Sequence, residues 1–115
     1  MSDEEKTIVE RVREGLGFLD TSFNTDLLVY INLASYDLYQ NSVIANPKVY
    51  EDTKLSELEP KVSDIEGILS YLTLNSKLLL DSPQPSMVAT YNDVISRLLD
   101  RLSMEVTQHD KEVIK

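Results

Sequence analysis

The stretch that decides the fold covers residues 85–106 and reads PSMVATYNDVISRLLDRLSMEV. Its apolar residues advance by three or four positions, the spacing of one face of an α-helix: Met87 or Val88, Tyr91, Val94 or Ile95, Leu98 and Leu102. The preceding DSPQP, at residues 81–85, is a sharp break, because Pro83 disfavours helix at Ser82 and Pro85 fits the first turn of a new helix. We therefore predict a helix over residues 85–106 that begins directly after this break.

Three further apolar stripes lie upstream of that helix. They predict helices over about residues 4–15, over about residues 24–40, and from residue 61 or 64 to residue 80. The stripes consist of Ile8, Val12 and Leu16; of Leu27, Ile31, Ala34 and Leu38; and of Val62, Ile65, Leu69, Leu72 and Leu79. Each predicted helix has candidate N-terminal caps, which are Ser2 or Asp3, Asn24 or Thr25, and Ser63 with Glu66 three residues on.

Residues 41–60 are the least regular part of the chain. Asn46, Pro47 and Pro60 interrupt any helical pattern, although a short turn at 55–59 is compatible with the sequence. A long connection of this kind is usually an ordered excursion or a functional loop. Its apolar residues offer contacts to other subunits or proteins, and they are Val43, Ile44, Val49 and Tyr50.

These patterns predict an all-α fold, a single-domain bundle of about four helices with a long irregular excursion between the second and the third. The 115 residues suit one domain, and three Gly and four Pro supply few of the turns that an all-β chain needs. We assign residues 1–106 to the helical domain and residues 107–115 to a polar, flexible C-terminal tail. The second, third and fourth helices should form the core, with Leu69, Leu72, Tyr91, Ile95 and Leu98 buried.

Composition excludes several classes of function. Twenty acidic residues against eleven basic ones give a net charge of −9, which disfavours unaided binding to phosphate backbones or anionic lipid. No apolar run approaches the roughly 20 residues of a membrane span, and the acidic start MSDEE is not followed by the apolar segment of a signal peptide. The expectation is an intracellular protein that does not bind membranes.

No motif points to catalysis, a metal or a cofactor. The carboxylates lack a paired arrangement, and Asp3, Glu4 and Glu5 are more simply a cluster at a helix start. His109, the one histidine, has no companion ligands at useful spacing. Gly15-Leu16-Gly17 lacks the third glycine and the preceding strand of a phosphate-binding loop. We therefore expect a protein that is not an enzyme; the rival hypothesis from the enzyme class is a carboxylate-based hydrolase or a metal-dependent enzyme.

The tyrosines of the second predicted helix and the arginine pair of the fourth each favour a structural interpretation. The second helix carries Tyr30, Tyr36 and Tyr39 without any Lys or Arg, so rings at the core edge or at a protein interface are favoured over rings that stack on nucleic acid. Arg97 and Arg101 lie four residues apart on the fourth helix. Asp93 and Asp100 balance them in a local salt-bridge ladder.

The order of the elements resembles the small head–tail connector proteins of tailed bacteriophages, also called head-completion or adaptor proteins. The segment YLTLNSKLLLDSP at residues 71–83 is similar to the family's apolar helix and Asp-Pro turn, and LDRL at residues 99–102 is similar to its final acidic–Arg–Leu signature. The opening VERVREGLG at residues 9–17, followed by TDLL at 25–28, also resembles the family's start. The resemblance spans about residues 5–106.

This resemblance implies a structural virion protein. Its members form a ring, usually of twelve copies, that joins the portal protein to the tail or stopper protein, and DNA passes through the centre without sequence-specific binding. The location implied is the virion, with host cytoplasm during assembly. The family's C-terminal segment docks on the portal, a role that falls here on residues 104–115, with Val113 and Ile114 as the apolar anchor and Lys111 and Lys115 as secondary charge contacts. The alternative is a small acidic helical adaptor that binds one partner protein, for instance through the tyrosines of its second helix.

Overall fold

A computed structural model describes the backbone of residues 5–18, 20–80 and 84–114, and the side chains of these ranges as far as Thr107. Four α-helices and one short 3-10 helix follow in chain order: α1 (Ile8–Gly15), α2 (Asn24–Gln40), η1 (Leu55–Leu58), α3 (Ile65–Leu80) and α4 (Pro85–Ile114). The described ranges contain two isolated β-bridges and no β-strand. The predicted all-α fold with four helices is confirmed.

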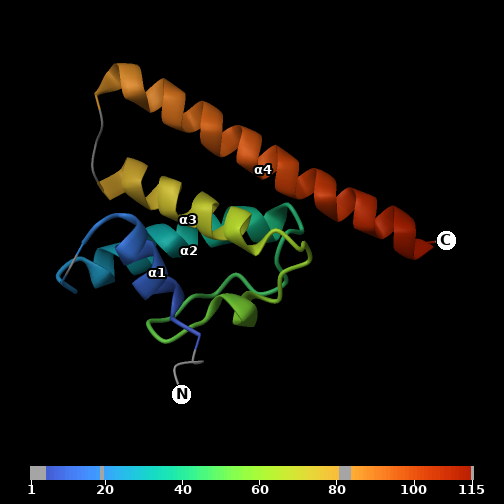
Figure 1. Ribbon diagram of the computed structural model, residues 1–115, viewed down its shortest axis with the longest axis horizontal. Coiled ribbons are helices and arrows are strands. Elements are labelled where there is room, and N and C mark those ends of the chain that lie inside the picture. The colour runs from blue at the N-terminus through green and yellow to red at the C-terminus, as the bar shows by residue number, and fades with distance from the viewer. Residues whose placement is uncertain (1–4, 19, 81–83, 115) are drawn as a thin grey trace.

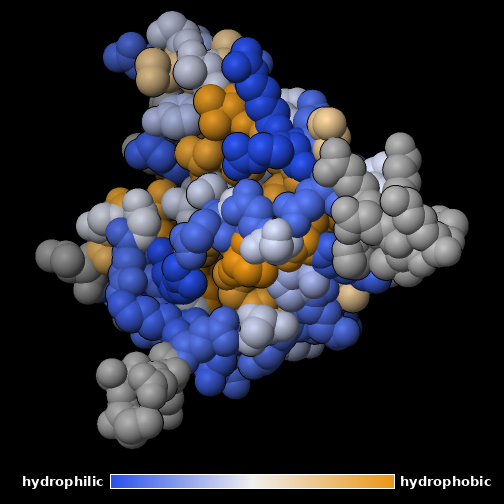
Figure 2. Space-filling model, turned by 45° about the vertical axis from the view of Figure 1, so that its right-hand side comes forward, coloured by the Kyte–Doolittle hydropathy of each residue, from blue (hydrophilic) through white to orange (hydrophobic). Residues whose placement is uncertain are grey.

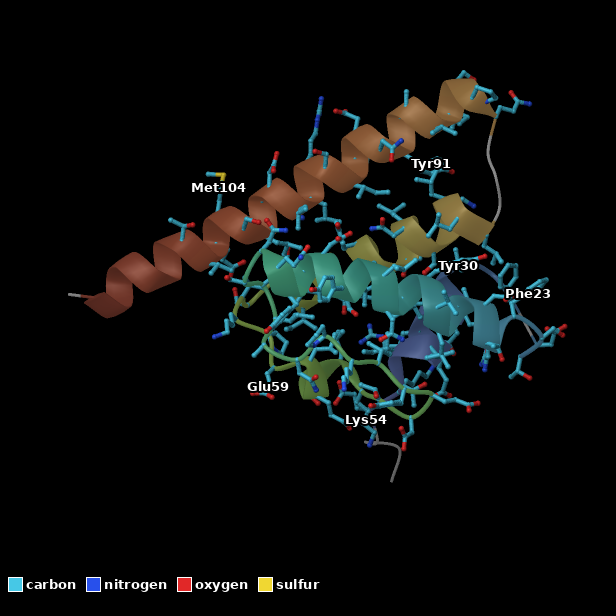
Figure 3. All side chains as sticks on the ribbon, turned by 180° about the vertical axis from the view of Figure 1, so that it is seen from behind. Phe23, Tyr30, Lys54, Glu59, Tyr91 and Met104 are labelled. Atoms are coloured by element: carbon cyan, nitrogen blue, oxygen red, sulfur yellow. The ribbon has the colours of Figure 1, made fainter. Side chains whose placement is uncertain are left out.

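Helix α3 lies at the centre and packs against α1, α2 and α4 (Figure 1). Helix α4 lies above α3 in this view, whereas α2 lies behind α3 and comes to the front when the molecule is seen from behind (Figure 3). The molecule is a thin plate of 48 × 43 × 21 Å. Helices α2 and α4 therefore occupy different sides of α3, and within the described ranges each has one face without a neighbouring helix.

The core draws on every helix and on the excursion. Leu72, Ile95 and Leu98 are buried as predicted, but Leu69 and Tyr91 are only partly buried. On α3 the neighbouring Ile68 takes the fully buried position. On α4 the buried residues begin only at Ile95, because the first turns of this helix lie apart from α3 (Figure 1).

Helix α1 begins at Ile8 and not near residue 4, because Thr7 and Glu10 form a capping box. The Thr7 Oγ1 accepts the Glu10 N–H at 3.2 Å, and Glu10 Oε1 accepts the Thr7 N–H at 3.0 Å. The bond from the Thr7 N–H, and next the bond that the Thr7 hydroxyl donates to the same Glu10 oxygen at 3.0 Å, lower the pKa of the Glu10 carboxyl. Ser2 and Asp3, the predicted caps, lie outside the described residues.

Helix α2 has the predicted bounds but a different cap. The N-cap residue is Phe23, which makes no side-chain capping bond, rather than Asn24 or Thr25. The ring of Phe23 instead packs against that of Phe18, with centroids 5.2 Å apart. Contact between apolar side chains therefore replaces a polar cap at this helix start.

Helix α3 begins at Ile65, and Asp64 caps it in place of Ser63. The Asp64 Oδ1 accepts the Gly67 N–H at 2.9 Å. A Cβ atom at position 67 would lie 2.8 Å from Asp64 Cγ, so glycine allows the carboxyl group to fold over the helix start. The close contact at this glycine is thus local to the cap.

Residues 41–60 are irregular, as predicted, with η1 at the position of the expected short turn. Their apolar side chains nevertheless complete the core. Two polar residues of α2 hold this excursion in place: Asn32 bonds the backbone of Val49, and Ser35 Oγ donates to the Pro47 carbonyl at 2.6 Å. Residues 41–60 are therefore an integral part of the folded domain.

Candidate interaction surfaces

The C-terminal part of α4 extends away from the rest of the domain (Figure 1). No Gly or Pro interrupts residues 86–114, and the helix continues to Ile114, past the end predicted at residue 106. Val106 is the last residue of α4 for which burial in the core is described. The predicted portal-docking residues Val113, Ile114, Lys111 and Lys115, together with His109, have side chains outside the described part of the chain.

Two polar contacts fix α4 against the start of α3. Glu105 Oε2 accepts the Ser63 N–H at 2.6 Å and the Ser63 hydroxyl at 2.7 Å. Arg101 Nη2 lies 3.5 Å from Asp64 Oδ2. The direction in which α4 leaves the domain is therefore set within about one and a half helical turns of Val106.

The predicted contact residues of the excursion divide into two groups. Val43, Ile44 and Val49 are buried in the core of their own subunit. Tyr50 is 61% exposed and presents its ring to solvent. Of these four residues, only Tyr50 offers a surface to another molecule without rearrangement of the fold.

Helix α2 bears a second apolar stripe, which we call the α2 ridge and define as Val29, Leu33 and Tyr36. These side chains are 54%, 58% and 51% exposed. They follow the same spacing of four and three residues as the core stripe, but they lie on the opposite side of the helix, two positions out of register with Leu27 and Ile31. The spacing of this ridge is visible in the sequence, but we did not predict the ridge. An apolar stripe alone does not show which face of a helix another element covers.

The tyrosines occupy several environments. Tyr71 is buried on α3, and its burial, together with the Asp37 carboxylate, raises its pKa to about 12. Tyr36 and Tyr39 are exposed on α2, with ring centroids 6.0 Å apart. Tyr30 and Tyr91 are partly buried. The rings of α2 therefore contribute apolar area to the surface of the domain.

A groove of about 570 Å³ lies between α3 and α4, and we call it the α3–α4 groove. Its apolar lining consists of Leu74, Val94 and Leu98, and Arg97 and Arg101 stand at its rim beside Ser70. Arg97 pairs with Asp93 at 3.1 Å, as predicted. Arg101 pairs across to Asp64 on α3 rather than with Asp100, because the helix pair brings the start of α3 close to this part of α4.

The described residues contain no group of three or more His, Cys, Asp or Glu side chains that could hold a metal ion. Within the same part of the chain, no helix is long and apolar enough to cross a membrane. The candidate interaction surfaces are therefore the α2 ridge, the α3–α4 groove and the projecting end of α4.

Residues 8–109 match the model of a protein family described as phage connector protein. The match covers most of the chain and includes all four helices, with only the last turns of α4 beyond it. Searches of curated proteins and of solved structures found no match.

Proposed function

The chain belongs to the phage connector protein family, a family of structural proteins, and we propose that it forms a ring joining the phage portal to the tail or stopper protein. The family match over residues 8–109 is the observation that carries this proposal. Several copies, with a dodecamer expected in the virion, would surround the path of the DNA. Assembly would take place in the host cytoplasm, and the finished ring would remain in the virion.

The projecting end of α4 is the proposed portal-docking element. Residues 107–114 continue the helix past Val106 by about 12 Å at 1.5 Å per residue. Val113 and Ile114 are adjacent in sequence and supply the apolar anchor, while Lys111 and Lys115 add charge contacts. Apolar anchors dominate such contacts and rim charges add little.

The acidic character of the chain supports passage of DNA through the ring. A net charge of −9 on each copy repels phosphate groups, so DNA would slide past the subunits instead of adhering to them. On the opposite side of the assembly, the excursion would supply contacts to a neighbouring subunit or to the tail. Tyr50 is the exposed contact residue there, and Val43, Ile44 and Val49 support its backbone from the core.

The test is binding of the full-length protein to its purified portal, followed by negative-stain imaging for a ring on the portal vertex. Deletion of residues 107–115 should lower binding and leave the melting temperature nearly unchanged, because this segment holds few apolar groups that could offset the entropy cost of ordering it. The double substitution Val113→Ser, Ile114→Ser should reproduce most of the loss. Met87→Ser is the matched control, since this exposed side chain lies near the other end of the same helix, outside the docking segment.

Undiminished portal binding by the deletion variant would overturn the docking role of the tail. Failure of the intact protein to bind the portal at all would overturn the connector proposal itself. That second result would favour the alternative of a small adaptor for a single partner, for which the exposed tyrosines of α2 are the natural contact surface.

A further inference from the structure

The α2 ridge is an apolar surface without a cover in the part of the chain that is described. Its three large side chains are each about half exposed and lie along successive turns of one helix. Helix α2 contains no Lys or Arg, and its two charged residues, Asp26 and Asp37, lie three turns apart along one flank of the ridge. Asp37 borders the same shallow surface pocket as Leu33 and Tyr36. The ridge therefore combines apolar knobs with an acidic edge.

The α3–α4 groove has the complementary character. Leu74, Val94 and Leu98 give it an apolar floor, and two arginines give it a basic rim. Figure 2 shows the corresponding pattern in the upper part of the molecule, where orange apolar surface between α4 and the body of the domain is bordered by blue charged side chains. Arg97 and Arg101 are well exposed, so each is available to a second carboxylate besides its own partner.

We propose that the α2 ridge of one copy of this chain seats in the α3–α4 groove of the next copy. This inference rests on the proposed ring and names the surfaces that build it. Leu33 and Tyr36 would enter the groove against Leu74 and Val94, and Asp37 would meet the arginine rim. Two copies of a chain with a net charge of −9 repel each other. Self-association is therefore favoured by a contact in which the few basic side chains of one copy pair with acidic side chains of the next.

The two surfaces lie on different sides of α3, since α2 and α4 flank this helix from different directions (Figures 1 and 3). A contact between unlike surfaces leaves a free ridge at one end and a free groove at the other. Repetition of such a contact generates a closed ring or an open filament, whereas a contact between like surfaces stops at a dimer. The pairing proposed here is thus of the kind that a connector ring needs.

Cysteine cross-linking tests the pairing directly, because the wild-type chain has no cysteine. Leu33→Cys combined with Val94→Cys places one thiol on each surface of every copy, and the two surfaces lie on different sides of α3. Under oxidising conditions, alone at high concentration or on the portal, this variant should give a ladder of multimers. Leu33→Cys combined with Asp100→Cys is the control and should give no ladder, because Asp100 is exposed on α4 but does not line the groove.

Charged substitutions provide a second, independent readout. Leu33→Asp blocks the ridge and Val94→Asp blocks the groove, and each should weaken self-association about tenfold or more, the usual effect of losing a central apolar contact. A mixture of the two variants retains one intact ridge and one intact groove, so it should form heterodimers and nothing larger. Sedimentation velocity and native mass spectrometry measure these states, and circular dichroism verifies that each variant is folded.

A ring on the portal that contains no cross-link between positions 33 and 94 would overturn this inference and leave the connector function standing. Heterodimers absent from the mixture would overturn it as well. A protein that binds no portal and forms no ring would instead refute the proposed function. Capture of a different protein by the ridge, lost in Leu33→Asp but not in Val94→Asp, would also contradict the pairing.

Discussion

The side-chain amide of Asn32 pairs with the backbone of Val49 through two hydrogen bonds. Its Oδ1 accepts the Val49 N–H at 2.9 Å, and its Nδ2 donates to the Val49 carbonyl oxygen at 2.9 Å and to that of Leu28 at 2.8 Å. The Asn32 amide thus makes the two hydrogen bonds with Val49 that the backbone of a neighbouring β-strand would otherwise make. In this way α2 fixes the irregular excursion whose apolar residues complete the core.

Asn32→Ala should therefore destabilise the domain by about 1–3 kcal/mol, because two partly buried backbone groups lose their partner. Chemical denaturation followed by circular dichroism measures this change. Asn41→Ala is the matched control, since Asn41 makes one exposed bond from its amide to the Asp37 carbonyl. A control that loses as much stability as Asn32→Ala would contradict the role assigned to the Asn32–Val49 pair.

Shortening either of two leucine side chains on the buried face of α4 should destabilise the domain. Leu102→Ala and Leu98→Ala should each lower the free energy of unfolding by about 2–5 kcal/mol, the range for a buried leucine. Leu102 should lie at the upper end, because it is 1% exposed whereas Leu98, at 9%, also lines the groove. Leu79→Ala serves as the control, since that side chain is exposed. Equal, small losses at all three positions would show that α4 does not pack on the domain in solution.

The contact between Glu105 and Ser63 should govern how firmly the end of α4 is held. Glu105→Ala removes an acceptor shared by the Ser63 N–H and hydroxyl, and should cost about 1–3 kcal/mol as a charged hydrogen-bond partner is lost. Hydrogen exchange should accelerate over residues 99–106 and around Ser63. Asp100→Ala, at an exposed position on the same helix, should leave both segments unchanged. Protection that persists in Glu105→Ala would contradict this role.

Tyr71 should make the domain sensitive to alkaline pH. Its pKa rises from 10.0 to about 12 on folding, because burial and the Asp37 carboxylate disfavour the phenolate. A raised pKa of an acid gives stability that is fully present below the unfolded value and is lost as the pH rises from about 10 toward 12. Absorbance titration of tyrosinate should show one late-titrating group, absent in Tyr71→Phe. That variant should also lose less stability between pH 9 and pH 11. A late-titrating group that persists in Tyr71→Phe, or a lost component that titrates near pH 10, would contradict the assignment.

Local sequence patterns were sufficient to predict the bounds of a helix that has clear apolar spacing and clear ends. Residues 24–40 were predicted and observed with the same bounds, because the stripe of Leu27 and Ile31 begins and ends at residues that interrupt it. Caps were less predictable. Ser63 and Asp64 are both good cap residues, and the choice of Asp64 depends on Glu105, 41 positions further along the chain, which takes the Ser63 groups for itself.

By itself, the sequence determined the all-α class, the order of the helices and the position of the excursion, because these follow from spacing and from breaks that act over a few residues. Only the tertiary structure decided which apolar residues are covered. Val49 and Tyr50 are neighbours in sequence, yet one is buried and the other is exposed. Leu33 and Ala34 differ in the same way on α2. Burial depends on which distant element packs against a face, and that partner is settled by the energy of the whole core rather than by the residues that form the stripe.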